Sequence, residues 1–288
     1  MINKEWSTSK LPDGTLLIKK YLGNEKNIIV PSVINGKNVS VIGKRALADI
    51  ASDTKTVFIE DGIKVIESSM ILPILAKEFE IEKIRIPDSV VQIDSPLIMK
   101  QDIEIECNPG TYANYYANEH NYKTSKKIEL LKYVPKENEK EAIIDDKYYI
   151  LSRRAFSNCK ELKHVVLSRN LYDIAKESAF RADGAFSGCD LLKTVGPAGS
   201  GCDIEYNWNG LIPNSAFYGS EVNTIYISKE IYSVGDYAFY GCGKNPIFYV
   251  SGYFRVGYHS FPEDAKIFLE DDNCPIDPSI KHLVVKNK

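Results

Sequence analysis

The residues that could perform chemistry are scattered along the chain and share no recognisable spacing. The histidines are His120, His164, His259 and His282. They form no H-E-x-x-H pair, and the chain contains neither a G-x-S-x-G turn nor a phosphate-binding loop. The acidic segment that begins with Asp271 and Asp272 lacks the regular spacing of ligand residues that a calcium-binding loop has. This pattern favours a protein that is not an enzyme and has no cofactor and no metal, with a hydrolytic enzyme as a remote alternative.

Cysteine could supply a nucleophile or a zinc ligand, but the six cysteines are spaced for neither. Cys159, Cys189 and Cys242 each stand three residues after a phenylalanine, and a repeated position of this kind is typical of a small buried side chain. The chain has no C-x-x-C pair and no Cys/His ligand spacing. Buried free thiols are therefore the favoured interpretation, while a disulfide and a catalytic or metal-binding role stay open.

An Ala-Phe pair recurs along the second half of the chain and marks a repeated structural element. Any site in this half must therefore be positioned by that element. The pairs are Ala155-Phe156, Ala179-Phe180 or Ala185-Phe186, Ala216-Phe217, Ala238-Phe239 and the altered Ser260-Phe261. The last three lie 22 residues apart, which suits one coil of a repeat solenoid. Each coil of a solenoid is sealed by its neighbours, so we expect alanine where backbones approach closely and phenylalanine between the coils.

Three motifs carry a resemblance to a known family. They are IRIPDSVVQI from Ile84 to Ile93, IYSVGDYAFYGC from Ile231 to Cys242, and RAFSNC from Arg154 to Cys159. Over most of its length the chain resembles the bacterial BspA-like leucine-rich-repeat proteins. The resemblance implies a β-rich α/β solenoid, a right-handed leucine-rich-repeat superhelix with an N-terminal hairpin cap and an internal capping helix. That family is a diverse set of surface and secreted proteins, so it implies a cell-surface or extracellular location and leaves the function open.

The chain is expected to divide into a cap and two repeat blocks. Residues 1–43 contain turn signals at Pro12–Gly14 and at Asn35-Gly36, which predict two hairpins over an exposed first coil. Residues 44–125 form a first block, closed by a helix over Tyr112–His120, and residues 126–288 form a second. The charged stretch after Lys123 favours a boundary, although one continuous solenoid stays open. The Gly-rich segment Val195–Phe217 is expected to be a loop, either a binding loop or an inert insertion.

Aromatic residues at outward strand positions of the second block are the candidate site. Because side chains alternate along a strand, the middle residue of each I-x-I pair points to solvent. The expected binding residues are Tyr226, Phe248 and Phe268, with Tyr172, Tyr232 and Phe254 in the neighbouring strand run. Three interpretations stay open: a surface for a protein or glycan partner, a shield over the sheet, and a contact with another part of this chain or with a second copy.

Composition limits the class of partner. The 36 Lys and Arg against 39 Asp and Glu give a net charge of −3, so nothing favours a nucleic acid or an anionic membrane. No stretch approaches the roughly 20 apolar residues of a membrane span, and the first residues lack the apolar core of a signal peptide, so a cytoplasmic location also stays open. The predicted function is a non-catalytic recognition module, with a structural spacer that has no ligand as the alternative. The oligomeric state is open.

Overall fold

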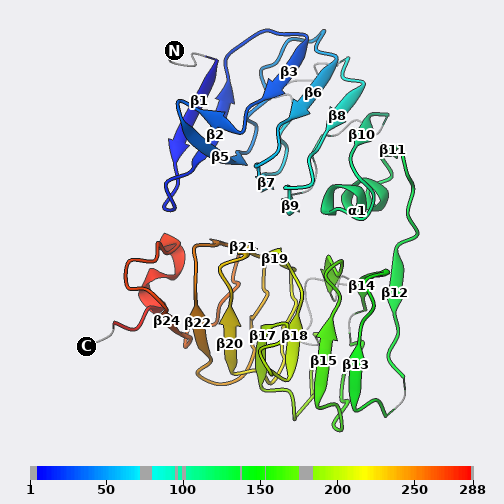
Figure 1. Ribbon diagram of the computed structural model, residues 1–288, viewed down its shortest axis with the longest axis vertical. Coiled ribbons are helices and arrows are strands. Elements are labelled where there is room, and N and C mark those ends of the chain that lie inside the picture. Colours follow the sequence, from blue (N-terminus) through cyan, green and yellow to red (C-terminus); the bar gives the residue numbers. More distant parts are fainter. Residues whose placement is uncertain are drawn as a thin grey trace. The chain divides into compact units, whose positions relative to one another are not determined.

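The computed structural model describes residues 5–71, 80–94, 97–98, 102–136, 138–152, 154–174 and 184–286. The chain divides into two compact units, Met1–Glu129 and Leu130–Lys288, and each unit has its own hydrophobic core. In both units short parallel strands from successive coils pair side by side (Figure 1). This is the strand-rich repeat architecture that the Ala-Phe pairs and I-x-I pairs predict.

The first unit is built from two sheets. One follows the order β1 (Trp6–Lys10), β2 (Leu16–Tyr21), β5 (Lys37–Ile42), β7 (Val65–Ile66) and β9 (Gln92–Ile93), with β4 (Val33–Ile34) also paired to β5. The other follows the order β11 (Lys123–Thr124), β10 (Glu104–Glu106), β8 (Lys83–Arg85), β6 (Thr56–Ile59) and β3 (Asn27–Val30). Alternate residues of these strands, such as Val57, Ile59 and Ile105, are buried, as the two-residue period of a strand requires.

Both predicted hairpins are present. Strands β1 and β2 pair antiparallel, and the Asp13 carboxylate accepts the backbone N–H of Thr15 in the turn between them at 3.0 Å. Strands β4 and β5 also pair antiparallel across Asn35 and Gly36, whose φ angles of 51° and 74° suit a tight hairpin turn. That these hairpins act as a cap stays a prediction.

The predicted helix is α1 (Tyr112–Glu119). Thr111 caps its first turn, because the Thr111 hydroxyl accepts the backbone N–H of Asn114 at 3.2 Å. Tyr116 lies in the core of the unit, where its hydroxyl accepts the backbone N–H of Leu97 at 2.9 Å. The inward face of the helix is thereby tied to the coils beneath it.

The second unit contains a long sheet and two short ones. The long sheet follows the order β13 (Glu141–Ile143), β15 (His164–Leu167), β18 (Ile204–Tyr206), β17 (Thr194–Pro197), β20 (Thr224–Ile227), β22 (Ile247–Val250) and β24 (Lys266–Leu269). One short sheet is β12 (Leu131–Tyr133), β14 (Tyr148–Leu151) and β16 (Asp173–Ile174), and the other is β19 (Gly210–Ile212), β21 (Ile231–Val234) and β23 (Arg255–Val256). A 3-10 helix, η1 (Pro278–Leu283), follows the last strand.

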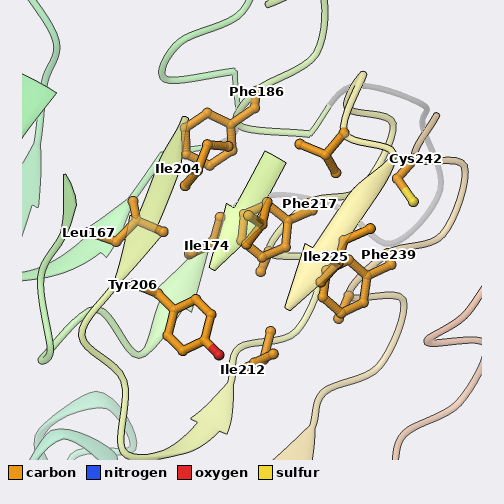
Figure 2. Close-up of a cluster of buried hydrophobic side chains, with 14 of the residues drawn as sticks. Leu167, Ile174, Phe186, Ile204, Tyr206, Ile212, Phe217, Ile225, Phe239 and Cys242 are labelled. Carbon is orange, nitrogen blue, oxygen red and sulfur yellow. The ribbon is translucent and has the colours of Figure 1, made fainter. Parts of the chain in front are cut away.

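Phenylalanines at the coil corners form the centre of the second unit. Phe156, Phe186, Phe217, Phe239 and Phe261 lie in that order, with neighbouring ring centroids 5.2–6.1 Å apart. Figure 2 shows three of these rings among inward residues of the strands, such as Ile204 and Ile225. The alternative pair Ala179-Phe180 lies outside the described residues.

The six cysteines are free. Cys189 and Cys242 are buried as expected of a repeated corner position, and burial raises the pKa of each thiol to about 12. Cys159, at the same position one coil earlier, is half-buried. The corner cysteines therefore act as small apolar side chains.

The expectation that Val195–Phe217 is a loop is largely wrong. This segment contains the end of β17 together with β18 and β19, and β18 lies between β15 and β17 although it follows both in sequence. Gly196 permits this arrangement, because a Cβ at this position would lie 2.7 Å from the Sγ atom of Cys202 and the Oγ atom of Ser200. The turn 198–203 thus folds tightly back and adds an extra strand to the sheet.

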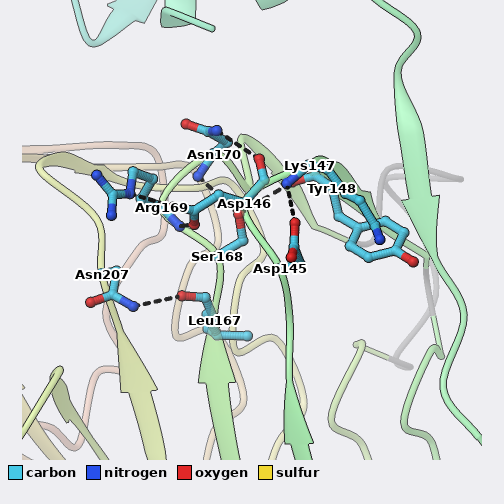
Figure 3. A network of polar contacts seen from close by, with 9 residues as sticks. All are labelled: Asp145, Asp146, Lys147, Tyr148, Leu167, Ser168, Arg169, Asn170 and Asn207. Carbon is cyan, nitrogen blue, oxygen red and sulfur yellow. Dashed lines mark hydrogen bonds and ion pairs between the residues drawn. The ribbon is translucent and has the colours of Figure 1, made fainter.

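Polar turns join successive coils at the ends of the strands (Figure 3). Asp146 accepts the backbone N–H of Arg169 at 3.1 Å and pairs with the guanidinium of the same residue at 2.6 Å. The Asn170 amide donates to the backbone carbonyl of Asp146 at 2.7 Å, and the Asn207 amide donates to that of Leu167 at 3.4 Å. Each of these contacts satisfies a polar group in the turn of a neighbouring coil. The polar residues therefore have a structural role, and no ligand is needed to explain them.

Candidate binding surface

A row of stacked aromatic rings lies on the outward face of the long sheet. Tyr226, Tyr249 and Phe268 occupy directly paired positions on β20, β22 and β24, and we call these three residues the strand-face row. The Tyr226 and Tyr249 ring centroids are 5.0 Å apart at 15°, and those of Tyr249 and Phe268 are 5.8 Å apart at 25°. Tyr226 and Tyr249 are each 41% exposed, and Phe268 is half-buried.

Phe248 is not part of this row, because it points into the core and is 0% exposed. Its register partner is the inward residue Ile225, and its ring lies 5.1 Å from Phe239 and 4.8 Å from Phe261. The inward pair of this strand is thus Phe248 and Val250, with Tyr249 between them. A signal for this register is present in the sequence, since FYVS from Phe248 aligns with IYIS from Ile225.

Phe254 is also buried, at 2% exposure, and stacks on Phe261 with centroids 5.9 Å apart. This coil is one residue shorter here than the preceding coil. Ser233 pairs with Arg255. The buried Ile231 lies two residues before Ser233, whereas Phe254 lies only one residue before Arg255. Phe254 therefore takes the inward position that Ile231 has in the preceding coil.

Tyr172 and Tyr232 do not join the strand-face row. Tyr232 is half-buried on β21 and meets Tyr253 edge to face at 6.5 Å. Tyr172 precedes β16, where it lies 6.4 Å from Tyr149, and burial raises its pKa well above the usual tyrosine range. The six expected residues thus divide between the long sheet, the two short sheets and the core.

The strand-face row is bounded along the sheet. On one side the neighbouring strand β17 offers Gly196, and the turn 198–203 folds over it. The Glu205 carboxylate holds this turn, because it accepts the backbone N–H groups of Gly199 at 2.8 Å and Gly201 at 2.9 Å. On the other side Val285 donates its N–H to the Ile267 carbonyl at 2.9 Å, so the segment after η1 covers part of the β24 edge.

The outward row of the first unit has a different composition. Ile29, Phe58, Arg85 and Glu106 are paired in register across β3, β6, β8 and β10. The Arg85 guanidinium lies 4.6 Å from the centre of the Phe58 ring and 3.5 Å from the Glu106 carboxylate. This mixture of apolar and paired charged side chains has no continuous aromatic surface.

The stacking determines what the strand-face row can contact. Tyr249 lies between Tyr226 and Phe268, so both faces of its ring are turned toward another ring. A sugar would need a free ring face to lie on, whereas Tyr249 at the centre of the row presents only its ring edge and hydroxyl. Edges of aromatic rings pack well against apolar side chains and carbonyl oxygens, as in a protein interface.

A second aromatic surface was missed by the sequence analysis. Tyr218, Tyr237, Tyr240, Tyr258 and His259 lie on the corner turns of the last coils, and we call them the turn cluster. Tyr240 is 44% exposed and Tyr258 is 63% exposed. In these last coils the residue before the corner Ala or Ser has a left-handed backbone, with φ of 55° at Tyr237 and 49° at His259, and strand alternation says nothing about such a position.

The described part of the chain brings together no cluster of side chains suited to catalysis or metal binding. Among the described residues no group of three or more His, Cys, Asp or Glu side chains could hold a metal ion. His164 lies 3.9 Å from Glu205, which the turn 198–203 already engages. No helix in the described ranges is long and apolar enough to cross a membrane.

The stacked coils, parallel sheet and corner phenylalanines of the second unit are those of a leucine-rich-repeat fold. The family model for the BspA type leucine rich repeat region matches residues 133–197 and 210–267, in six copies. The resemblance predicted from the motifs is confirmed, and the second unit carries BspA-type leucine-rich repeats. Repeats of this family are typical of protein-interaction modules and are generally non-catalytic.

Several solved bacterial structures are similar to the chain. The pneumococcal vaccine antigen PcpA is 12% identical, with 100% of this chain and 98% of that chain covered and a TM-score of 0.31. A leucine-rich repeat protein from Bacteroides ovatus is 18% identical, with 93% and 70% covered and a TM-score of 0.29. A leucine rich cell surface protein from Faecalibacterium prausnitzii is 16% identical, with 91% and 95% covered and a TM-score of 0.25. No curated protein matches the sequence. At these scores the similarity says nothing about what the chain binds.

Proposed function

We propose that this chain is a non-catalytic recognition module whose second unit binds a partner protein through the strand-face row. The single observation that carries the proposal is the continuous stack of Tyr226, Tyr249 and Phe268 on the outward face of a rigid sheet. Tyrosine and phenylalanine supply a large contact area and lose little conformational entropy on binding. A row that merely shielded the sheet would bind nothing.

A protein is the favoured occupant because of the ring geometry. The stacked rings present edges and hydroxyls, which suit side chains and backbone carbonyls of a partner better than the flat face of a sugar. The sheet itself is held by parallel ladders on both sides of β22, so the rings are positioned before binding. Such preorganisation reduces the entropy cost of association.

The proposal includes a site of action at the cell surface or outside the cell. Its only support is the resemblance to a family of surface and secreted proteins. The right-handed sense of the coils, the caps and the division into blocks at residues 43 and 125 also stay predictions.

The experiment is a titration with three proteins. Wild type, the triple variant Tyr226→Ser, Tyr249→Ser, Phe268→Ser, and a control Val166→Ser are purified, and partners captured from a bacterial envelope extract are identified. Each purified partner is then titrated calorimetrically. Val166 is a matched control because it occupies the same outward row on β15.

The triple variant is expected to bind the partner at least about 100-fold more weakly, since central aromatic residues of an interface each contribute about 2 kcal/mol or more. The control should bind as wild type does. Unchanged affinity in the triple variant, or saturable binding by no captured protein, would favour the structural spacer instead.

A further inference from the structure

Several rings of the turn cluster meet edge to face, which no pair in the strand-face row does. Tyr237 meets Tyr240 at 76° and Tyr258 at 77°, with centroids 5.7 Å and 5.6 Å apart. Tyr258 meets His259 at 77° with centroids 4.0 Å apart. Rings at such angles stand as walls and leave more free ring surface than a flat stack does. Two other pairs of the cluster are stacked, Tyr218 on Tyr240 at 21° and Tyr237 on His259 at 28°.

Tyr237 lies at the centre of the turn cluster, because its ring contacts those of Tyr240, Tyr258 and His259. Partial burial raises the pKa of Tyr237, and the nearby oxygens of Tyr258, Asp236, Tyr240 and Tyr218 raise it further. Neutral hydroxyls carry no net charge, so the negative charge beside these rings comes from the Asp236 carboxylate. A carboxylate next to aromatic rings favours a cation over an anion.

Asp236 adds a carboxylate to this surface. Its Oδ1 atom accepts the backbone N–H of Tyr258 at 2.7 Å, which ties the turn of one coil to the next. Its Oδ2 atom accepts no hydrogen bond from any residue that the structure describes. The exposed Asp236 side chain thus retains an acceptor for a ligand.

The corner turns of the last three coils contain acidic residues and no lysine or arginine. Residues 214–220, 236–242 and 258–264 contain Asp236, Glu263 and Asp264 and neither Lys nor Arg. The equivalent turn of an earlier coil, at residues 153–159, begins with two arginines. The aromatic walls and the acidic character therefore coincide in the last three corners of the second unit.

We propose that the turn cluster, together with Asp236, is a second binding surface that takes an arginine side chain of a partner protein. A guanidinium can stack on a tyrosine ring while its N–H groups donate to a carboxylate and to hydroxyls, and the walls and Asp236 offer both contacts. The surface lies on the corner turns and is distinct from the strand-face row, so either can fail without the other.

The test uses the full chain and a labelled short peptide of arginine, glycine and serine, titrated by fluorescence anisotropy at low salt. A peptide with citrulline in place of arginine is the matched probe, because citrulline keeps the planar shape and loses the charge. Wild type is expected to bind the arginine peptide at least about fivefold more tightly than the citrulline peptide, and higher salt should weaken the binding.

Variants then locate the binding. Tyr258→Ala and Tyr240→Ala should each weaken binding of the arginine peptide about two- to fivefold, and Asp236→Asn about fivefold. Tyr240 stacks on Tyr218 and Tyr258 meets Tyr237 edge to face, so each variant should melt somewhat below wild type and remain folded at the temperature of the titration. Tyr226→Ser, on the strand-face row, should bind the peptide as wild type does. Equal binding of the two peptides, or an unchanged affinity in the double variant Tyr240→Ala, Tyr258→Ala, would overturn the proposal.

Discussion

The sharpest prediction contrasts two neighbouring aromatic residues of β22. Phe248 is 0% exposed and lies within 5.1 Å of the Phe239 and Phe261 ring centres, whereas Tyr249 is 41% exposed on the opposite face. Phe248→Ala should lower the free energy of unfolding by about 3 to 5 kcal/mol, because it removes a buried ring and leaves a cavity. Tyr249→Ala removes two stacking contacts and should cost about 1 to 2 kcal/mol.

The assay is equilibrium unfolding in urea, followed by circular dichroism and by tyrosine fluorescence. With a denaturant dependence of about 2 to 3 kcal/mol per M, the midpoint should fall by about 1.5 M for Phe248→Ala and by about 0.5 M for Tyr249→Ala. The two signals must change together, since repeat proteins can unfold in parts. If Tyr249→Ala lowers the midpoint as much as Phe248→Ala, the register of β22 is wrong, and with it the strand-face row.

Three further predictions concern single positions. Ser215→Gly should raise the free energy of unfolding by about 0.5 kcal/mol, because glycine relieves the φ of 55° at this corner, while Ser215→Ala should bring no gain in a thermal melt. Cys189 and Cys242, whose pKa is raised to about 12, should escape alkylation by iodoacetamide at pH 8 in the folded protein and react in urea, as read by mass spectrometry. The backbone N–H of Gly199 donates to the Glu205 carboxylate and holds its pKa below the usual glutamate range, although partial burial acts in the opposite direction. Its stability contribution should therefore be full above the ordinary glutamate pKa and should be lost as the pH falls through the lowered value, so the advantage of wild type over Glu205→Gln in urea melts should disappear in acid.

The sequence predicted the repeat architecture well because its signals are local and recur. The corner residues Ala216 and Phe217, like Ala238 and Phe239, are buried as the pattern requires. Likewise the hairpin at Asn35-Gly36 follows from turn chemistry alone.

The sequence predicted the binding row only in part, for two physical reasons. Alternation along a strand implies that every second residue faces solvent but does not say which of the two sets does. The apolar run IFYV therefore allows either Phe248 or Tyr249 to face solvent. The pairing of β18 between β15 and β17 depends on a close approach over Gly196, which no periodic pattern encodes. The turn cluster was missed because Tyr237 and His259 sit in left-handed turns, to which neither strand nor helix periodicity applies.

The most direct test of the proposed recognition is hydroxyl-radical footprinting of the second unit within the full chain, with and without a purified partner. The account predicts that oxidation of Tyr226, Tyr249 and Phe268 falls together when the partner is bound, while oxidation of the exposed Ile143 at the far end of the same sheet does not change. Oxidation of the three rings at the same rate in the free and the bound protein would contradict it.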